Sequence, residues 1–265
     1  MRIQAIKYLK MKNKPVRRRA REKQEEREII SESFIDPFNN PNPIKRLIKI
    51  SQLAWTDKQK DFFKIALSHD TKVMFVNGPA GTSKSLLSVY CGLQLLNLKA
   101  ISDIMYLRSA VESSDSKLGY LPGTAEDKLR FYNMPFLDKL DELLPTTRAE
   151  KLEQEGRISM FPVNFARGMN WTNKCVILDE AQNSSMKEIT TVLTRLGKGS
   201  RCFVLADPMQ TDLKGRDAIG GFEKLYKVFT DQQSREMGIH TFEFGVDDIM
   251  RSKLCKFIVK KVNTV

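Results

Sequence analysis

Short apolar runs recur along the chain from residue 73 onward, and longer stretches with helical spacing of apolar positions separate them. A run that is apolar throughout is typical of a strand buried on both faces, as in the centre of a parallel sheet. The expected strands cover residues 73–77, 104–107, 158–163, 175–178, 202–206 and 239–244. The last run alternates between apolar and polar positions, so we expect it near an edge of the sheet.

Helices are expected between these strands. The first opens at Thr56 or Asp57, either of which can cap it. The others cover 83–98, 126–144, 185–196, 218–229 and 248–262. Because Pro135 falls inside a helical stretch, we expect a kink or two shorter helices there. Strands that alternate with helices predict an α/β fold, with a doubly wound, mostly parallel sheet and helices on both faces.

The first 45 residues differ in composition from the remainder. Residues 1–28 carry eleven Lys and Arg against four Glu, and residues 31–45 have the proline and asparagine content of a linker. We therefore divide the chain into a basic N-terminal extension and linker, 1–45, and one domain, 46–265. The net charge of +12 indicates a polyanionic partner, most often nucleic acid. A solvated extension, or an arm packed on a neighbouring subunit, fits the same composition.

The cysteines and histidines favour neither a disulfide framework nor a zinc or His-based metal centre. The four cysteines are far apart and form no C-x-x-C pair, which indicates small core residues in a reducing compartment. Two histidines are too few for a His-based centre. No membrane span or signal-peptide core is visible. We expect no membrane partner and a cytoplasmic location, which would be that of a host if the chain is viral.

Residues 78–85 carry the strongest chemical signal, because they nearly match the phosphate-binding loop G-x-x-x-x-G-K-[ST] between an expected strand and an expected helix. Curled backbone N–H groups and a helix N-terminus attract a polyphosphate. Lys84 would reach the β- and γ-phosphates, and the Ser85 hydroxyl would hold Mg²⁺. The alternative is a serine-rich turn that only caps a buried helix. The expected nucleotide contacts are Gly78, Pro79, Ala80, Gly81, Thr82, Ser83, Lys84 and Ser85.

Ser83 stands where the motif has its second glycine. A residue with a Cβ fits there if its backbone is in the right-handed helical region, which we expect because position 83 opens the helix. The substitution also motivates a second hypothesis, in which the protein is a nucleotide-gated binding module with little turnover.

Polar residues follow two other expected strands. Asp179 would support Mg²⁺ at the tip of the strand 175–178, and Glu180 would act as the base that orients water for attack on the γ-phosphate. Gln210 follows the strand 202–206 and would sense the γ-phosphate. The alternatives are a capped helix start after the first strand and a plain Asp-Pro turn after the second.

Weaker candidates surround this set. Gln59 lies in a region that often contacts adenine in helicase-like ATPases, although a helical glutamine is more often solvated. Arg108 follows a strand, where a charged side chain points toward the ligand crevice of a parallel sheet. A positive charge at the transition state favours phosphoryl transfer, and the candidate arginines are Arg108, Arg167, Arg195 and Arg251.

These motifs together resemble the PhoH family of P-loop ATPases, over about residues 50–262. The matching stretches are 78–85, 108–112, 117–123, 167–168, 178–183, 193–197, 207–210 and 248–251. The chain departs from the family pattern at Ser83, at Ser109, where proline is usual, and at Ala206, where glycine is usual. Some relatives carry an N-terminal ribonuclease domain, and residues 1–50 are too short for one.

The resemblance implies a RecA-like P-loop core that hydrolyses ATP with Mg²⁺. It also implies a homo-oligomeric ring, with hexamers expected, and a role in binding, remodelling or unwinding RNA or another single-stranded nucleic acid. In the family pattern, Arg251 looks like a finger that a neighbouring subunit inserts into the site. A small-molecule kinase is a third hypothesis, and the absence of a clear arginine-rich lid in the sequence disfavours it.

Overall fold

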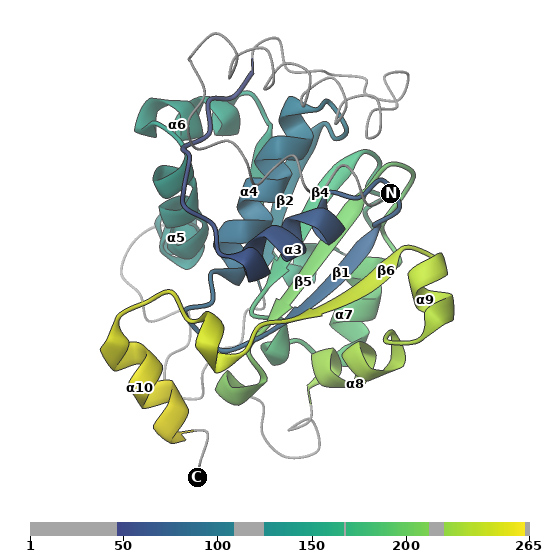
Figure 1. Ribbon diagram of the computed structural model, residues 1–265. Coiled ribbons are helices and arrows are strands. Elements are labelled where there is room, and N and C mark those ends of the chain that lie inside the picture. Colours follow the sequence, from purple (N-terminus) through teal and green to yellow (C-terminus); the bar gives the residue numbers. More distant parts are fainter. Residues whose placement is uncertain (1–46, 109–124, 167, 212–219, 263–265) are drawn as a thin grey trace, which may run out of the picture.

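The computed structural model describes residues 47–108, 125–166, 168–211 and 220–262 (Figure 1). The predicted basic extension and linker at 1–45, Ser109 and Arg167 lie outside the described residues. No described helix is both long enough and apolar enough to cross a membrane.

Within these described ranges, six strands form one sheet in the order β3-β2-β4-β5-β1-β6, and every neighbouring pair is parallel. The α/β prediction is therefore confirmed, as is the edge position of the strand at 239–244. Because β5 lies between β1 and β4, the carboxyl ends of these three strands meet at one edge of the sheet. The strands are β1 Val73–Asn77, β2 Asp103–Arg108, β3 Ile158–Pro162, β4 Lys174–Asp179, β5 Arg201–Ala206 and β6 Ile239–Glu243.

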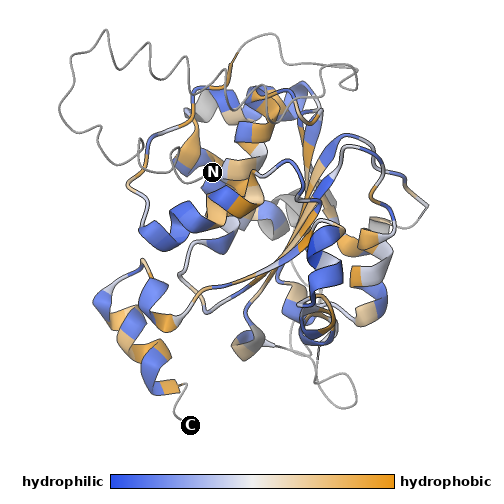
Figure 2. Ribbon diagram, turned by 45° about the vertical axis from the view of Figure 1, so that its right-hand side comes forward, coloured by the Kyte–Doolittle hydropathy of each residue, from blue (hydrophilic) through white to orange (hydrophobic). Residues whose placement is uncertain are grey.

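Helices cover both faces of the sheet (Figure 1). Alternate strand residues feed two separate cores, one under α3 to α6 and the other under α7 and α8. In Figure 2 the apolar colour accordingly follows the sheet and the inner helix surfaces. The helices are α3 Asp57–Ala66, α4 Lys84–Asn97, α5 Ala125–Leu143, α6 Thr146–Gln154, α7 Met186–Leu193, α8 Gly221–Val228, α9 Gln232–Glu236 and α10 Lys253–Val262.

Several helices differ from the sequence predictions. Helix α4 begins at Lys84 rather than at position 83. Helix α5 is one helix with Pro135 inside it, so of the expected kink or two shorter helices the division into two does not occur. Helix α10 begins at Lys253, after a short 3₁₀ turn at Val246–Asp248, so Arg251 lies in the connection before the helix and not in its first turn.

Helix α10 lies away from the sheet (Figures 1 and 2). None of its residues is buried, although it carries apolar side chains with helical spacing. Its exposed apolar residues are Leu254, Phe257, Ile258 and Val262.

Candidate active site

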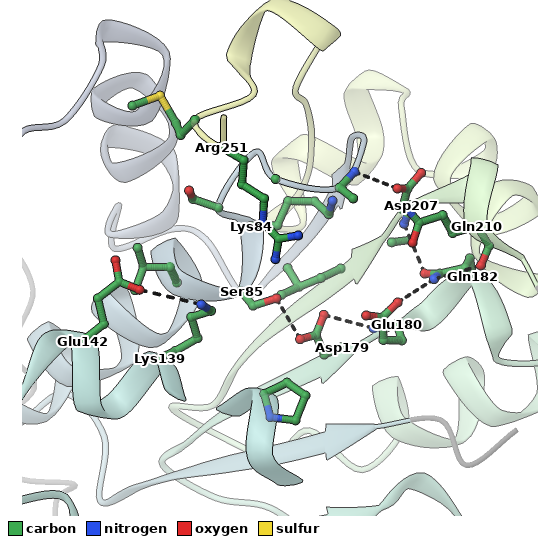
Figure 3. Close-up of a pocket in the computed structure, with 18 residues that line it drawn as sticks. Lys84, Ser85, Lys139, Glu142, Asp179, Glu180, Gln182, Asp207, Gln210 and Arg251 are labelled. Carbon is green, nitrogen blue, oxygen red and sulfur yellow. Dashed lines mark hydrogen bonds and ion pairs between the residues drawn. The ribbon is translucent and has the colours of Figure 1, made fainter. Parts of the chain in front are cut away.

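A cavity of about 470 Å³ opens at the edge of the sheet where β1, β4 and β5 end (Figure 3). The loop after β1, the tip of β4, the tip of β5 and one side of α5 form its wall. Its lining residues are Ala80, Gly81, Ser83, Lys84, Ser85, Leu86, Pro135, Lys139, Glu142, Asp179, Glu180, Gln182, Leu205, Ala206, Asp207, Gln210, Met250 and Arg251. The topology therefore brings together residues that are more than a hundred positions apart in the chain.

Two glycines of the loop are required by its geometry. A Cβ at Gly78 would come within 2.8 Å of the Phe244 Cβ, so no larger residue fits beside that turn. Gly81 has φ of 86°, a conformation that side-chain-bearing residues rarely adopt. The loop thus has the curled backbone that the motif predicts.

Ser83 corrects one prediction. Its φ of 66° and ψ of 20° place it in the left-handed region, and not in the right-handed helical region. The helix begins one residue later, so Ser83 keeps the conformation that suits glycine at this position of the loop. Its hydroxyl makes no capping hydrogen bond. The serine is therefore accommodated with backbone strain, which costs on the order of 1–2 kcal/mol for an L-residue.

We expect Ser83→Gly to raise the free energy of unfolding by roughly 0.5–1 kcal/mol, because the relieved strain exceeds the added freedom of the unfolded chain. Denaturant unfolding measures this difference. Ser83→Ala is the matched control, since it removes the hydroxyl and keeps the Cβ. Equal stabilities of the Gly and Ala variants would contradict the assignment of strain.

Lys84 is turned back onto its own loop. Its Nζ donates hydrogen bonds to the carbonyl oxygens of Gly78, at 2.6 Å, and Pro79, at 3.0 Å. Burial lowers the pKa of Lys84 below its ordinary value, while the nearby carboxylates of Asp207, Asp179 and Glu180 act in the opposite direction. The ammonium group is thus held inside the cavity among carboxylates, close to where the loop would receive phosphate.

Ser85 and Asp179 are in direct contact. The Ser85 hydroxyl donates to Asp179 Oδ2 at 2.7 Å, and the buried Tyr106 hydroxyl donates to the same oxygen at 2.9 Å. Burial raises the pKa of Tyr106, and the Asp179 charge adds to this rise, so the phenol stays protonated and serves as a donor. The carboxylate predicted to face the loop therefore touches it.

A hydroxyl beside a carboxylate fits Mg²⁺. This ion binds proteins through one or two oxygen ligands and completes its shell with water and substrate phosphate. Within the described ranges, no three His, Cys, Asp or Glu side chains gather into a metal cluster. The donor set thus suits an ion that arrives with a phosphate ligand rather than one caged by protein alone.

Glu180 is held by a residue that the sequence did not reveal. Its Oε2 accepts a hydrogen bond from Gln182 Nε2 at 2.6 Å, and its backbone has φ of 54° in the left-handed region. The buried Gln182 also accepts from the Asp207 N–H at 3.1 Å. Gln182 therefore joins the tips of β4 and β5 and fixes the Glu180 carboxylate at the same time.

Asp207 is a second residue that the sequence predictions left out of the site. Its Oδ2 accepts from the Ala80 N–H at 2.7 Å, and its Oδ1 accepts from the Met209 N–H at 3.2 Å. Asp207 ties the phosphate loop to the 3₁₀ turn Pro208–Gln210, where Gln210 lines the cavity. Its position directly after a buried strand and three residues before Gln210 was the signal in the sequence that could have identified it as a site residue.

Arg251 lies in the cavity of its own chain. The neighbouring Met250 N–H donates to the Gly81 carbonyl at 2.9 Å, and a Cβ on Gly81 would lie 3.3 Å from the Arg251 side chain. The segment before α10 therefore folds back across the loop and brings Arg251 to the cavity of its own chain. The role of Arg251 as a finger toward a neighbouring subunit stays a prediction.

Of the other described candidates, none lines the cavity; these are Gly78, Pro79 and Thr82 of the loop, Gln59, Arg108 and Arg195. Gln59 is buried, and its Oε1 accepts from the Thr56 N–H at 3.0 Å in the cap of α3, so its polar end is occupied there. Arg108 ends β2 and pairs in register with Asp179 of β4, one strand away from the site. Arg195 lies beyond α7, and its backbone carbonyl accepts from Trp171.

Comparison with known proteins agrees with these motifs. The family model described as PhoH-like protein matches residues 53–263. A PhoH-like protein of Synechocystis is 34% identical over 207 residues, which cover 78% of this chain and 61% of the relative. Protein PhoH of Escherichia coli is 31% identical over 206 residues, covering 77% and 56%. The chain thus spans little more than half of the length of these relatives.

Among solved structures, the Pif1 helicase of Candida albicans aligns with 80% of this chain and 44% of its own. The sequence identity of this pair is 16% and the TM-score is 0.42.

Proposed function

Because the chain belongs to the PhoH family and has its RecA-like P-loop fold, we propose that the cavity binds ATP and hydrolyses it with Mg²⁺. One observation carries the proposal. The Ser85 hydroxyl at the end of the phosphate loop lies 2.7 Å from the Asp179 carboxylate, and Glu180 follows directly. A loop that binds phosphate, a site for the metal and a carboxylate for water are thereby brought to one cavity wall.

Each residue of the cavity has its own role in the binding and hydrolysis of ATP. Backbone N–H groups of the loop and Lys84 bind the phosphates and balance the charge that develops on them. Ser85 and Asp179 would hold Mg²⁺, which when bound neutralises charge on the phosphoryl oxygens. Glu180 accepts the proton of the attacking water. Gln210 contacts the γ-phosphate, and Arg251 supplies a further positive charge from the same chain.

We further propose that the protein forms a homo-oligomeric ring, a hexamer in the simplest case, and uses ATP to bind or remodel RNA or another single-stranded nucleic acid. The net charge of +12 supports an anionic partner. Because Arg251 already lies in its own chain's cavity, such a ring would not have to supply this arginine from a neighbour. Sedimentation with a non-hydrolysable ATP analogue measures the oligomeric state.

The second candidate function is a nucleotide-gated binding module with little turnover. The hydrogen bonds that hold Lys84 to its own loop favour it, since they must break before Lys84 can bind phosphate. The strained Ser83, which replaces the glycine of the motif, favours it as well. Steady-state phosphate release, with and without RNA, separates the two functions. Release above background supports the ATPase, whereas ATP binding with background release under both conditions supports the binding module.

A further inference from the structure

Helix α5 presents a narrow stripe to the cavity, with one proline and two charged residues. Pro135, Lys139 and Glu142 all line it, and their spacing of four and three residues places them on one face of a helix. The adjacent face, about 100° further around the helix, carries Phe136, Leu140 and Leu143, which are buried in the core. This burial fixes the rotation of α5, so the stripe faces the cavity because of the fold and not by a chance rotamer.

A series of contacts also fixes the position of α5 along its axis relative to the site. The Phe136 ring stacks on the Tyr106 ring, with centroids 4.5 Å apart and an interplanar angle of 19°. The Tyr106 hydroxyl in turn donates to Asp179 at 2.9 Å. Lys139 comes one helical turn after Phe136, and Figure 3 shows it reaching from α5 toward Ser85. It therefore approaches the side of the cavity where Ser85 and Asp179 lie.

Glu142, the anionic partner of Lys139 among the described side chains, holds it weakly. The Lys139 Nζ lies 3.7 Å from Glu142 Oε2, and the two side chains are 33% and 45% exposed. A long, half-exposed pair on one helix contributes little to stability. The terminal phosphate of a nucleotide carries more charge than one carboxylate, and charges interact more strongly inside a cavity than at a surface. Lys139 can therefore exchange Glu142 for phosphate at small cost.

Resting on the proposed function, we propose that Lys139 contacts the terminal phosphate and lets the cavity distinguish a nucleoside triphosphate from a diphosphate. Glu142 is its partner when no triphosphate is bound. The loop N–H groups bind the phosphates that both nucleotides share, and Lys84 reaches the β-phosphate of both and the γ-phosphate of the triphosphate. Lys139 adds a second positive charge for the γ-phosphate from the side of Ser85 and Asp179. The residue thus determines specificity for the length of the phosphate chain.

Equilibrium titration of the full chain with ADP and with a non-hydrolysable ATP analogue, both with Mg²⁺, tests this proposal. Lys139→Met should weaken binding of the analogue about tenfold and binding of ADP less than about twofold, as expected for loss of one charge-assisted contact to the last phosphate. Lys139→Arg should retain most of the affinity for the analogue. Glu142→Gln should tighten analogue binding about twofold, because it removes the competing anion.

Lys151→Met is the matched control, because Lys151 lies on α6, pairs with Glu155 and does not line the cavity. Equal loss of ADP and analogue affinity in Lys139→Met, or no loss of either, would overturn the role of Lys139 while leaving the ATPase proposal intact. Failure of the unchanged protein to bind either nucleotide would overturn both proposals.

Discussion

Glu180→Gln should lower the rate of ATP hydrolysis at least about 100-fold, as expected when a general base is lost. The amide is nearly the same size as the carboxylate, and it can still accept the hydrogen bond from Gln182, so the side chain stays in place. It cannot accept a proton from water. ATP affinity should therefore remain within about threefold of the original, because no phosphate contact is removed.

Phosphate-release kinetics and nucleotide titration together measure these two effects. Glu153→Gln, an exposed change on α6, is the control and should leave both values unchanged. Hydrolysis at the normal rate in Glu180→Gln would refute the assignment of Glu180 as the base. Equal losses of affinity and rate would instead indicate a role in binding.

Lys84→Met should reduce ATP turnover by about 1,000-fold, since it removes the main charge that faces the transferring phosphoryl group. Nucleotide affinity should fall as well, because the same ammonium group serves the bound substrate. Lys224→Met, an exposed change on α8, is the control. Turnover close to that of the unchanged protein would contradict the phosphate-binding role of the loop.

The same variant has a pH-dependent effect on stability with a definite sign. Burial lowers the pKa of Lys84 in the folded protein below the ordinary value of 10.5. Between the lowered pKa and 10.5, the unfolded chain therefore binds more protons at this residue than the folded protein does. The unchanged protein should gain stability relative to Lys84→Met as the pH rises through this interval. Denaturant unfolding of both proteins at several pH values measures the difference.

Local patterns were sufficient to predict the strands and the meeting of polar residues at their tips. The phosphate loop and the Asp179–Glu180 pair each combine an apolar strand with polar residues directly after it, and a parallel sheet brings such ends together. Gln182 and Asp207 were missed as site residues because their importance depends on β4 and β5 being neighbours. That adjacency is a property of the sheet order, which a single strand does not encode.

The wrong predictions have a similar origin. The right-handed conformation expected for Ser83 followed from assuming that the helix starts there, whereas the loop geometry delays the start by one residue. The position of Arg251 depends on the path of the chain between β6 and α10, and the Met250 hydrogen bond to Gly81 sets that path. The helical spacing of apolar residues in the sequence does not show that the chain before α10 folds back across the phosphate loop.

The left-handed backbone of Glu180 has a consequence for attempts to make the protein more heat-resistant. Glycine at this position would relieve on the order of 1–2 kcal/mol of strain. It would also remove the carboxylate that the strained turn orients toward the cavity. At Ser83 the same exchange sacrifices no reactive group. Thermal stability and catalysis can therefore be changed independently at Ser83 but not at Glu180, so of these two residues the serine is the safe target for protein engineering.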